Sequence, residues 1–421
     1  MKILVVGCGG REHALVWKLA HDSARPDLYC MPGNAGTAAL ATNVPIAAEA
    51  IEAIVAWADE HRPALTVIGP EAPLCAGLTD ALQALGLRVF GPNRAAAELE
   101  GSKTFAKAVM QAAGVPTAAA AAFTDSDAAL AYVERQGLPI VVKADGLAAG
   151  KGVAVCETAE QAELAIRQSL DHGVFGPAGG RVLIEECLVG EEASILALVD
   201  GERTLMLAAS QDHKRALDGD RGPNTGGMGA YSPAPVVTDA HWPLIRERVL
   251  DPVLAELKRR GIVYKGVLYA GLMMTADGPK VLEFNCRFGD PETQAVLPRI
   301  AGDLLPALEA CVDGRLEPGL IRWRDEACGC VVMASGGYPG AYAKGIPIAG
   351  LEAAGEAPDT VVFHAGTALQ DGRVVTAGGR VLGVTALGAD LRAAVDRAYA
   401  AVGAIRFDGA AYRHDIAARA L

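Results

Sequence analysis

Short apolar strands alternate with helices between Lys2 and Gly91, and this alternation constrains the fold more than any other feature. It predicts strands at 2–7, 27–30, 65–69 and 87–91, and helices at 12–20, 51–58 and 74–85. Such strands form a parallel sheet that helices cover on both faces. Ligands of these sheets bind beyond the carboxyl ends of the strands, where the sequence has the loops GCGGREH, PGNAG and GPEAP. We therefore expect three loops to meet over one site.

The pattern changes after a helical stretch at 96–114. Paired strands at 139–144, 153–157 and 181–188 surround one amphipathic helix at 158–169, which predicts a small α+β lid. The alanine run TAAAAAF at 117–123 precedes a further helix, and no strand is expected in it.

A third block has predicted strands at 191–200, 204–210, 267–274 and 280–285, with a helix at 241–260. The stretch LEPGLIRWRDEACG is typical of a linker, and a β-rich module follows it to the C-terminus. The sequence has no internal repeats.

Composition excludes several classes of protein. A net charge of -12 argues against a nucleic-acid binder, which needs a basic face. The N-terminus MKILVVGCGG is too short an apolar run for a signal peptide, and no segment is apolar enough to span a bilayer, so we expect a cytoplasmic protein. The nine scattered cysteines indicate reduced thiols, and alternation along a strand explains the pair Cys328 and Cys330 better than a metal site does.

Two glycine-rich loops resemble nucleotide-binding motifs without matching them. In GCGGRE, Glu12 occupies the third glycine position of a dinucleotide-binding loop, so a Rossmann cofactor is disfavoured. The loop still has backbone N–H groups at a helix N-terminus, which suit a phosphate, although a plain tight turn also explains it. DGLAAGKG lacks Walker A spacing and joins two strands, where it would fold over a triphosphate or form a simple hairpin.

Charged residues stand where strands end, and their spacing indicates a site. Lys143 closes an apolar strand, where a charge is costly without an anionic partner such as a phosphate. Glu283 and Asn285 alternate with Leu282 and Phe284, so their oxygens share one face of a strand, as Mg²⁺ ligands would. An ordinary polar sheet face is the competing interpretation of Glu283 and Asn285.

Two further loops are more polar than simple connecting segments need to be. The first, QDHKR at 211–215, leads into the second, GPNTGGMG at 222–229, and both indicate substrate handling. His213 lies in a basic run, where a solvated neighbour is as common as a general base, so it is left unassigned.

Together these segments resemble the ATP-grasp superfamily, and specifically its glycinamide ribonucleotide synthetases, the phosphoribosylamine–glycine ligases. The similarity runs through the whole chain, in the order GCGGREHALVWKLA, PGNAGTA, VIGPEAPL, LEGSKTFAK, VVKADGLAAGKGV, IEECLVGEEAS, SQDHKR, GPNTGGMGAYSPAP, EFNCRFGDPETQ, GGYPG, FHAGT and GGRVL. It implies a multidomain α/β and α+β chain. The implied parts are an N-terminal Rossmann-like (pre-ATP-grasp) domain at 1–102, an ATP-grasp domain at 103–325 with a lid subdomain at about 118–190, and a C-terminal β-rich domain at 326–421.

The resemblance also implies a reaction and its participants. ATP, glycine and 5-phosphoribosylamine would give glycinamide ribonucleotide, ADP and phosphate through glycyl phosphate, with Mg²⁺ or Mn²⁺, in de novo purine biosynthesis. The substrates would be small molecules, with no nucleic acid or membrane partner, and the protein would be a monomer or weak dimer. The alternative is another ATP-grasp carboxylate–amine ligase or carboxylase of nucleotide metabolism, and a rival of another class is a non-catalytic ATP-binding regulatory protein.

By the same resemblance, each motif contributes residues to the site. The implied catalytic residues are Arg287, Lys143 and Asp212. The implied ATP-binding residues are Lys103, Lys143, Gly150, Lys151, Gly152, Glu185, Glu186, Cys187, Leu188 and Glu192. The implied substrate-binding residues are Gly10, Arg11, Gly33, Asn34, Glu71, Asp212, Lys214, Arg215, Asn224, Thr225, Gly226, Arg287, Asp290, Pro291 and Glu292. Glu283 and Asn285 would bind the metal.

The sequence departs from the family pattern at two positions. Cys8 stands where Asn or Ser is usual, and Arg221 stands where Thr commonly precedes GPNTGG. If these positions act through backbone atoms, neither change alters the site.

Overall fold

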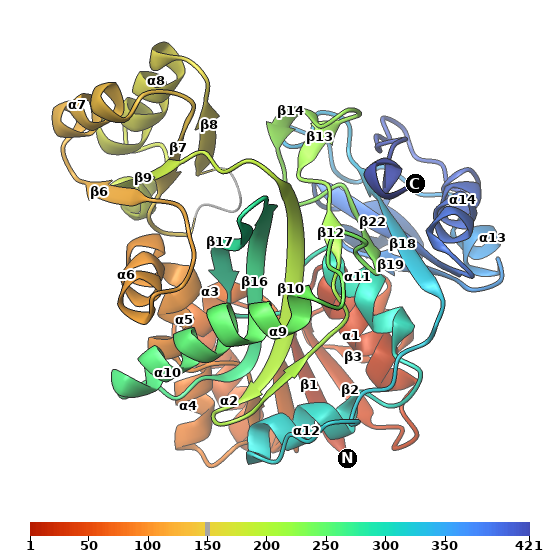
Figure 1. The fold of residues 1–421 in the computed structure, drawn as a ribbon. Helices are drawn as coiled ribbons and strands as arrows, with labels where there is room; N and C mark the ends of the chain where they lie inside the picture. The colour runs from red at the N-terminus through yellow and green to blue at the C-terminus, as the bar shows by residue number, and fades with distance from the viewer. Residues whose placement is uncertain (148–151) are drawn as a thin grey trace.

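The N-terminal part is a five-stranded parallel sheet in the order β3-β2-β1-β4-β5, as the strand–helix alternation predicts. The structure is a computed structural model that describes residues 1–147 and 152–421 (Figure 1). The strands are β1 (Lys2–Gly7), β2 (Asp27–Pro32), β3 (Thr42–Asn43), β4 (Leu65–Ile68) and β5 (Val89–Phe90). The helices are α1 (Gly10–Ala20), η1 (Thr37–Ala39), α2 (Ile51–His61), α3 (Glu71–Cys75) and α4 (Leu78–Ala84).

Two helices that the sequence predicts as continuous are broken in the structure. The break between α3 and α4 falls at Gly77, whose φ of +90° no helical residue adopts. The predicted helix at 96–114 is α5 (Arg94–Gly101) followed by α6 (Lys103–Ala113). Ser102 lies between them in an extended conformation, and its hydroxyl caps α6 by accepting the N–H of Phe105. The second helix, α6, therefore begins at Lys103, a residue predicted to bind ATP.

The lid is a four-stranded antiparallel sheet in the order β6-β9-β7-β8, and it projects from the rest of the molecule (Figure 1). Its elements are β6 (Ala120–Phe123), α7 (Ser126–Gln136), β7 (Ile140–Ala144), β8 (Val153–Cys156), α8 (Ala159–Leu170), η2 (Gly176–Gly179) and β9 (Val182–Glu186). The sequence prediction missed β6, because alanine favours helices when nothing else decides. Pairing with β9 overrides that preference, and β6 becomes an edge strand.

The central antiparallel sheet has the order β11-β10-β16-β17. Its strands are β10 (Glu191–Asp200), β11 (Thr204–Met206), β16 (Lys265–Thr275) and β17 (Gly278–Asn285). The strand predicted at 204–210 is shorter than expected, since after Met206 only a single bridge joins Ser210 to Ser194. The helix predicted at 241–260 consists of α9 (His241–Ile245), the π-helical turn η3 (Arg246–Leu250) and α10 (Asp251–Arg259).

A third large sheet, in the order β12-β15-β18-β22-β19, joins the middle of the chain to its end. Its strands are β12 (Gln211–Asp212), β15 (Gly229–Ser232), β18 (Ala327–Ala334), β19 (Thr360–His364) and β22 (Arg380–Gly388). The hairpins are β13 (Arg215–Leu217) with β14 (Arg221–Asn224), and β20 (Thr367–Gln370) with β21 (Arg373–Thr376). The remaining helices are α11 (Glu292–Val296), η4 (Leu297–Arg299), α12 (Leu305–Asp313), α13 (Leu351–Gly355), α14 (Leu391–Val402) and η5 (Ala418–Ala420). As predicted, Cys328 and Cys330 lie on one strand, β18.

One buried apolar cluster fixes how these parts sit together. It includes Ile3 of the N-terminal sheet, Tyr269 of the central sheet, Leu308 of α12 and Phe363 of β19. A shared core of this kind resists sliding between its elements, so the loops at the ends of the three sheets are held in place. None of the helices in residues 1–147 and 152–421 has the length and apolarity needed to cross a membrane.

Candidate active site

Lys143 ends β7, and protein groups surround its ammonium group. Its Nζ atom lies 2.6 Å from Oε2 of Glu185 and donates to the carbonyl oxygen of Leu282 at 3.0 Å. Lys107 lies 2.8 Å from the other carboxylate oxygen, Oε1, of Glu185. All three charged side chains are buried. The anionic partner expected for Lys143 is thus a glutamate in this structure, and two lysines against one carboxylate leave one positive charge for an incoming anion.

Lys103 begins α6 and reaches toward the loop that follows β7. Its Nζ donates to the carbonyl oxygen of Gly146 at 3.0 Å. Burial lowers the pKa of Lys103, while the nearby carboxylate of Glu283 acts in the opposite direction. An ammonium group that is costly to bury here gains most from a ligand with negative charge.

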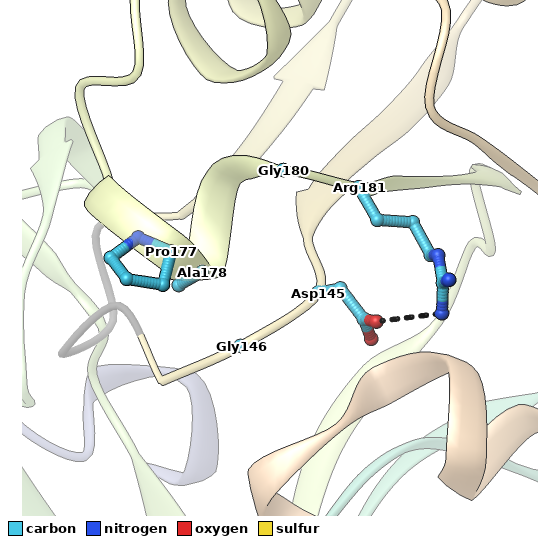
Figure 2. Close-up of a pocket in the computed structure, with 6 residues that line it drawn as sticks. All are labelled: Asp145, Gly146, Pro177, Ala178, Gly180 and Arg181. Atoms are coloured by element: carbon cyan, nitrogen blue, oxygen red, sulfur yellow. Dashed lines mark ion pairs between the residues drawn. The ribbon is translucent and has the colours of Figure 1, made fainter.

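A cavity of about 340 Å³ lies between the first residues of that loop and η2 of the lid (Figure 2). Its lining consists of Asp145, Gly146, Pro177, Ala178, Gly180 and Arg181. The guanidinium of Arg181 lies 3.6 Å from the carboxylate of Asp145, which also accepts the N–H of Thr104 at 2.7 Å. Gly150 and Lys151, both predicted to bind phosphate, lie outside the described residues, whereas Gly152 is buried and accepts a backbone hydrogen bond from Ala144.

The end of β9 carries the residues predicted to bind adenine. Glu185 is paired on both sides, with β6 and with β7, so its backbone groups are used in the sheet. The N–H of Glu186 donates to the carbonyl of Ala119 at 2.9 Å. Cys187 and Leu188 follow the strand and are partly exposed. Of the four residues, only the last two have backbone groups that lie beyond the sheet.

Glu283 and Asn285 lie on β17, paired with Gly271 and Tyr269 of β16. A Cβ atom at Gly271 would lie only 3.2 Å from Cγ of Glu283, so the glycine leaves room for this side chain. Glu192 of β10 is held by Lys214, whose Nζ lies 2.6 Å from Glu192 and 3.9 Å from Glu283. One lysine therefore links the predicted ribose-binding and metal-binding carboxylates.

Positive charges around Glu283 keep it ionised. Burial opposes ionisation, but Lys214, Lys143 and Lys103 outweigh it, so the pKa of Glu283 lies below its ordinary value. An ionised carboxylate beside an amide oxygen is a donor set that fits Mg²⁺ or Mn²⁺. Within residues 1–147 and 152–421 no group of three or more His, Cys, Asp or Glu could hold a metal ion. A metal bound to Glu283 and Asn285 would therefore take most of its ligands from substrate and water.

Arg287 follows β17 and joins the carboxylate of Glu100, which is 7% exposed, to that of Glu71, which is 29% exposed. Its Nε lies 3.2 Å from Glu71, and its Nη2 lies 3.0 Å from Glu100. Burial raises the pKa of Glu100 to about 7, against the pull of Arg287. For Glu71 burial also acts to raise the pKa, yet Arg287 and Arg11 prevail and lower it to about 2. One guanidinium thus holds α3 and α5 against the end of the central sheet.

The loop that opens α1 is already occupied by protein carboxylates. The N–H of Gly9 donates to Glu12 at 2.6 Å, and the N–H of Arg11 donates to Asp290 at 3.3 Å. A Cβ atom at Gly10 would lie 2.5 Å from Nε2 of Gln294, so this glycine is required by close packing. The guanidinium of Arg11 is the charge that the loop can offer to an anion, although it also contacts Glu12.

Asn34 ties three loops together. Its amide nitrogen donates to the carbonyl oxygens of Cys8 at 2.9 Å and His364 at 2.8 Å. Its amide oxygen accepts the N–H of Gly36 at 2.9 Å. Gly33, just before it, has a φ of +71°, which a glycine adopts without strain. The side chain that the sequence assigns to substrate is fully used in holding the FHAGT loop against the N-terminal part.

Asp212 lies on β12, buried beside Lys214 and Glu292. Burial raises its pKa to about 7, with Lys214 opposing and Glu292 adding to the effect. Glu292 is itself buried and accepts a hydrogen bond from the hydroxyl of Tyr269 at 3.0 Å. The three predicted residues therefore form one charged cluster beneath Glu283.

The GPNTGG loop bridges the lid, the substrate residues and the C-terminal sheet. Asn224 donates to the carbonyl of Val153 in β8 at 3.4 Å. Thr225 donates to the carbonyl of Lys214 at 2.9 Å, and the N–H of Gly226 donates to the hydroxyl of Tyr338 at 3.1 Å. This loop therefore connects the lid to Lys214 and to the C-terminal part of the chain.

Arg215, Asp290 and Pro291 lie around the same loop. Arg215 donates to the carbonyl of Gly222 at 2.9 Å. A Cβ atom at Gly227 would lie 2.4 Å from Cδ of Pro291, so the turn at Asp290 packs directly on the loop. Burial acts to raise the pKa of Asp290, but Arg380 and Arg11 outweigh it and lower that pKa.

Family models match nearly the whole chain. They are phosphoribosylglycinamide synthetase N domain at residues 1–100, ATP-grasp (A) domain at 101–293 and C domain at 328–419. The chain belongs to the phosphoribosylglycinamide synthetase family. The ATP-grasp domain of this family implies the use of ATP with a divalent metal.

Relatives in the phosphoribosylglycinamide synthetase family are similar from end to end. The phosphoribosylamine–glycine ligase of a Nostoc species is 54% identical, covering 100% of this chain and 99% of its own. That of Vibrio cholerae is 52% identical, with the same coverage. The crystal structure of the Thermotoga maritima phosphoribosylamine–glycine ligase has a TM-score of 0.86 at 33% identity, covering 99% of this chain and 100% of its own. The biotin carboxylase domain of Hydrogenobacter thermophilus 2-oxoglutarate carboxylase shares the fold alone, with a TM-score of 0.74 at 17% identity, covering 98% of this chain and 91% of its own.

Three charged residues of this phosphoribosylglycinamide synthetase border the site, although the sequence analysis assigns them no role. Lys107 shares Glu185 with Lys143, and Glu100 shares Arg287 with Glu71. Arg380 donates to the carbonyl oxygens of Asp290 at 2.8 Å and Gly226 at 2.5 Å. Glu100 and Arg380 lie within the LEGSK and GGRVL segments, so their motifs were visible. Their contacts across the fold were not.

Proposed function

We propose that this chain ligates glycine to 5-phosphoribosylamine, converting ATP to ADP and phosphate and giving glycinamide ribonucleotide for de novo purine biosynthesis. Full-length similarity to phosphoribosylamine–glycine ligases supports this activity. The observation that carries the chemistry is the ring of cations, Lys103, Lys143 and Lys214, around the ionised carboxylate of Glu283. Such a ring suits a triphosphate that brings its own metal ion.

The first step activates the carboxylate of glycine. One of its oxygens attacks the γ-phosphorus in line, ADP leaves, and glycyl phosphate forms. Lys103 and Lys143 hold phosphate oxygens, while the backbone at Cys187 and Leu188 receives adenine and Glu192 receives the ribose. Glu186 lies beside the adenine, and Glu185 acts through its hold on Lys143. Glu283 and Asn285 would hold Mg²⁺ or Mn²⁺, and the metal ion would supply positive charge against the charge that builds on the phosphate oxygens.

The second step forms the amide bond. The amine nitrogen of phosphoribosylamine attacks the acyl carbon, phosphate leaves, and the nitrogen loses a proton. Asp212 has a pKa of about 7, so its carboxylate is suited to accept that proton at neutral pH. Arg287 lies at the end of β17 and stabilises the oxyanion, and the lid covers the acyl phosphate against water.

The remaining predicted residues bind the substrates. Arg11 contacts the amine substrate from the N-terminal part. Glu71 acts through its ion pair with Arg287. Gly10, Gly33 and Asn34 set the shape of the loops around the amine. Lys214, Arg215 and the Asn224–Gly226 loop, with Asp290–Glu292, enclose glycine and the phosphoribosyl group. We place the domain boundaries at 102/103 and 325/326, with the lid at about 118–190. We place the protein in the cytoplasm, as a monomer or weak dimer without nucleic-acid or membrane partners.

The test is ATP consumption by the purified protein with glycine and phosphoribosylamine generated in place from ribose 5-phosphate and ammonia. Phosphate and glycinamide ribonucleotide, the latter identified by mass, are expected in equal amounts and only when both substrates are present. ATP turnover that requires bicarbonate or formate instead of glycine would contradict the substrate assignment and leave the ATP site intact. ATP binding without turnover under any of these conditions would contradict the enzyme assignment.

A further inference from the structure

The C-terminal residues of the chain contact the 213–221 loop, which contains the predicted substrate residues Lys214 and Arg215. Arg413 is 1% exposed, although it lies only eight positions before Leu421, the last residue. Its Nε and Nη2 atoms each donate to Asp415 at 2.7 Å. Its Nη1 atom donates to Asp220 at 2.7 Å and to the carbonyl oxygen of Arg215 at 3.1 Å. The buried guanidinium of Arg413 is thus satisfied by Asp415 and by two groups of the 213–221 loop.

Other residues of the C-terminal segment also form hydrogen bonds with this loop and with Asp212 before it. Arg419 donates to the carbonyl oxygen of Asp212 at 3.2 Å, and the N–H of Ala417 donates to Nε2 of His213 at 3.0 Å. The N–H of Gly219 donates to Asp415 at 2.8 Å. Contacts therefore run along the loop from its first residues to its tip.

The N–H of His414 adds a further contact with the loop, donating to Asp218 at 2.8 Å. We call residues 413–419 the C-terminal clasp.

His213 connects the clasp to Asp212 and Lys214. Its ring is buried against Ala417 and Arg419, with Nδ1 lying 2.9 Å from Nη2 of Arg419. Its neighbours on either side, Asp212 and Lys214, belong to the charged cluster beside Glu283. In extended chain, alternate side chains point to opposite sides. The clasp therefore contacts His213 on one side of this short segment, while Asp212 and Lys214 point to the opposite side.

Burial of Arg413 needs a reason beyond the stability of the C-terminal sheet. A buried guanidinium is costly unless all of its donors are matched, and replacing it with an apolar side chain is often no less stable. The core around α14 and β22 already has its own apolar side chains, such as Val384, Ala398 and Phe407. The partners of Arg413 lie instead in the loop and in Asp415, which also binds the loop.

We propose that Arg413 and Arg419 are positioning residues, which hold the 213–221 loop so that Asp212, Lys214 and Arg215 meet the substrates. This inference rests on the proposed function and adds the C-terminal segment to the machinery of that site. A loop that is fixed before substrate arrives loses less entropy on binding, so loosening it should weaken substrate binding more than ATP binding.

The test compares Arg413→Lys and Arg419→Ala with Arg397→Lys. A lysine at 413 keeps the charge but cannot contact Asp415 with two nitrogens and also reach Asp220. Arg419 is an exposed residue outside the apolar clusters, so its removal spares the core if Arg413→Lys disturbs folding. Arg397 is the control because it pairs with Asp359 at 2.9 Å within the same sheet region and does not contact the loop.

We expect both clasp variants to raise the KM for glycine or for the amine about tenfold, equivalent to about 1.4 kcal/mol, with the KM for ATP unchanged. Hydrogen–deuterium exchange should speed up in peptides covering 213–221 and stay the same in the central sheet. Arg397→Lys should change neither quantity. If both clasp variants kept wild-type KM values, or if their loops exchanged at the wild-type rate, the inference would be wrong.

The exchange measurement separates this inference from the proposed function. A wild-type protein that does not ligate glycine would contradict the function, whatever the variants do. A wild-type protein that ligates glycine, with clasp variants that match it in kinetics and in exchange, would contradict the positioning role alone.

Discussion

Nη2 of Arg287 lies 3.0 Å from Oε1 of Glu100, whose side chain is 7% exposed against 17% for Arg287. Burial raises the pKa of Glu100 to about 7, from an ordinary value of 4.5. The folded protein therefore holds this proton more tightly than the unfolded chain does between pH 4.5 and pH 7. Unfolding becomes easier as the pH rises through that window.

The change Glu100→Gln should remove this pH dependence. Relative to the variant, the free energy of unfolding of the wild type should fall by about 3 kcal/mol between pH 4.5 and pH 7.5, at about 1.4 kcal/mol per pKa unit. Urea titrations at half-unit pH steps measure it. Parallel curves for the two proteins would show that Glu100 titrates normally.

Arg287→Lys should reduce kcat while the protein stays folded. A single ammonium cannot reach both Glu71 and Glu100, which the forked guanidinium does at 3.2 and 3.0 Å. We expect a loss of about a hundredfold, the effect of removing one preorganised donor from a charge-developing centre. Thermal unfolding of the same samples is the control. A lysine variant with wild-type kcat would remove Arg287 from the proposed mechanism.

Glu283→Gln should weaken the response to metal. The carboxylate is held ionised by the surrounding lysines, and the amide removes that charge without changing the shape. We expect ligation to fall about a hundredfold or more, with a higher Mg²⁺ concentration for half-maximal rate. Glu202→Gln is the matched control, because Glu202 pairs with Lys258 on the surface. Equal metal titrations for the two variants would contradict the predicted metal site.

Lys143→Met and Lys107→Met should differ, although both lysines contact Glu185. Lys107 also donates to Thr117 and Ala118, at 2.8 and 3.1 Å, so it is committed to the protein. We expect the KM for ATP to rise about tenfold in the Lys143 variant, or about 1.4 kcal/mol, and less than about threefold in the other. Steady-state kinetics at saturating glycine and amine measures both values. A larger effect at Lys107 would reverse the assignment.

Cys8→Ser should leave activity unchanged, because this position contacts Asn34 through its backbone oxygen and its side chain is exposed. Asn34→Ala should cost about 1–3 kcal/mol of stability, since buried backbone groups of three loops lose their partner. Thermal unfolding and the KM for the amine give both answers. A serine variant with altered KM would mean that the thiol itself contacts substrate.

The parts of the fold that could be predicted from sequence are those that local patterns specify. The parallel sheet at 2–91 follows from apolar strands separated by helices, and the placement of Glu283 and Asn285 on one strand follows from alternation. The roles of most site residues were predicted only from the family motifs, because periodicity does not specify them. Strand β6 was missed because only its pairing with β9 makes an alanine run a strand.

The same limit applies to the site. Lys143 was expected to have an anionic partner such as a phosphate, and β9 places the carboxylate of Glu185 within 2.6 Å of it. Arg380 and Arg413 contact residues more than a hundred positions away, at Gly226 and Asp220, and nothing local distinguishes them from surface arginines. Side-chain partnerships across sheets depend on tertiary packing, which a single sequence shows only through motifs.

The pairing of β15 with β18 has a consequence for how the chain is made. The ribosome releases β15, at 229–232, long before β18, at 327–334, and β22, at 380–388. The N-terminal sheet, whose strands are all within the first ninety residues, can fold as it emerges. Until β18 has been synthesised, β15 can pair only with β12, and its other edge is open to pairing with another chain, which favours aggregation.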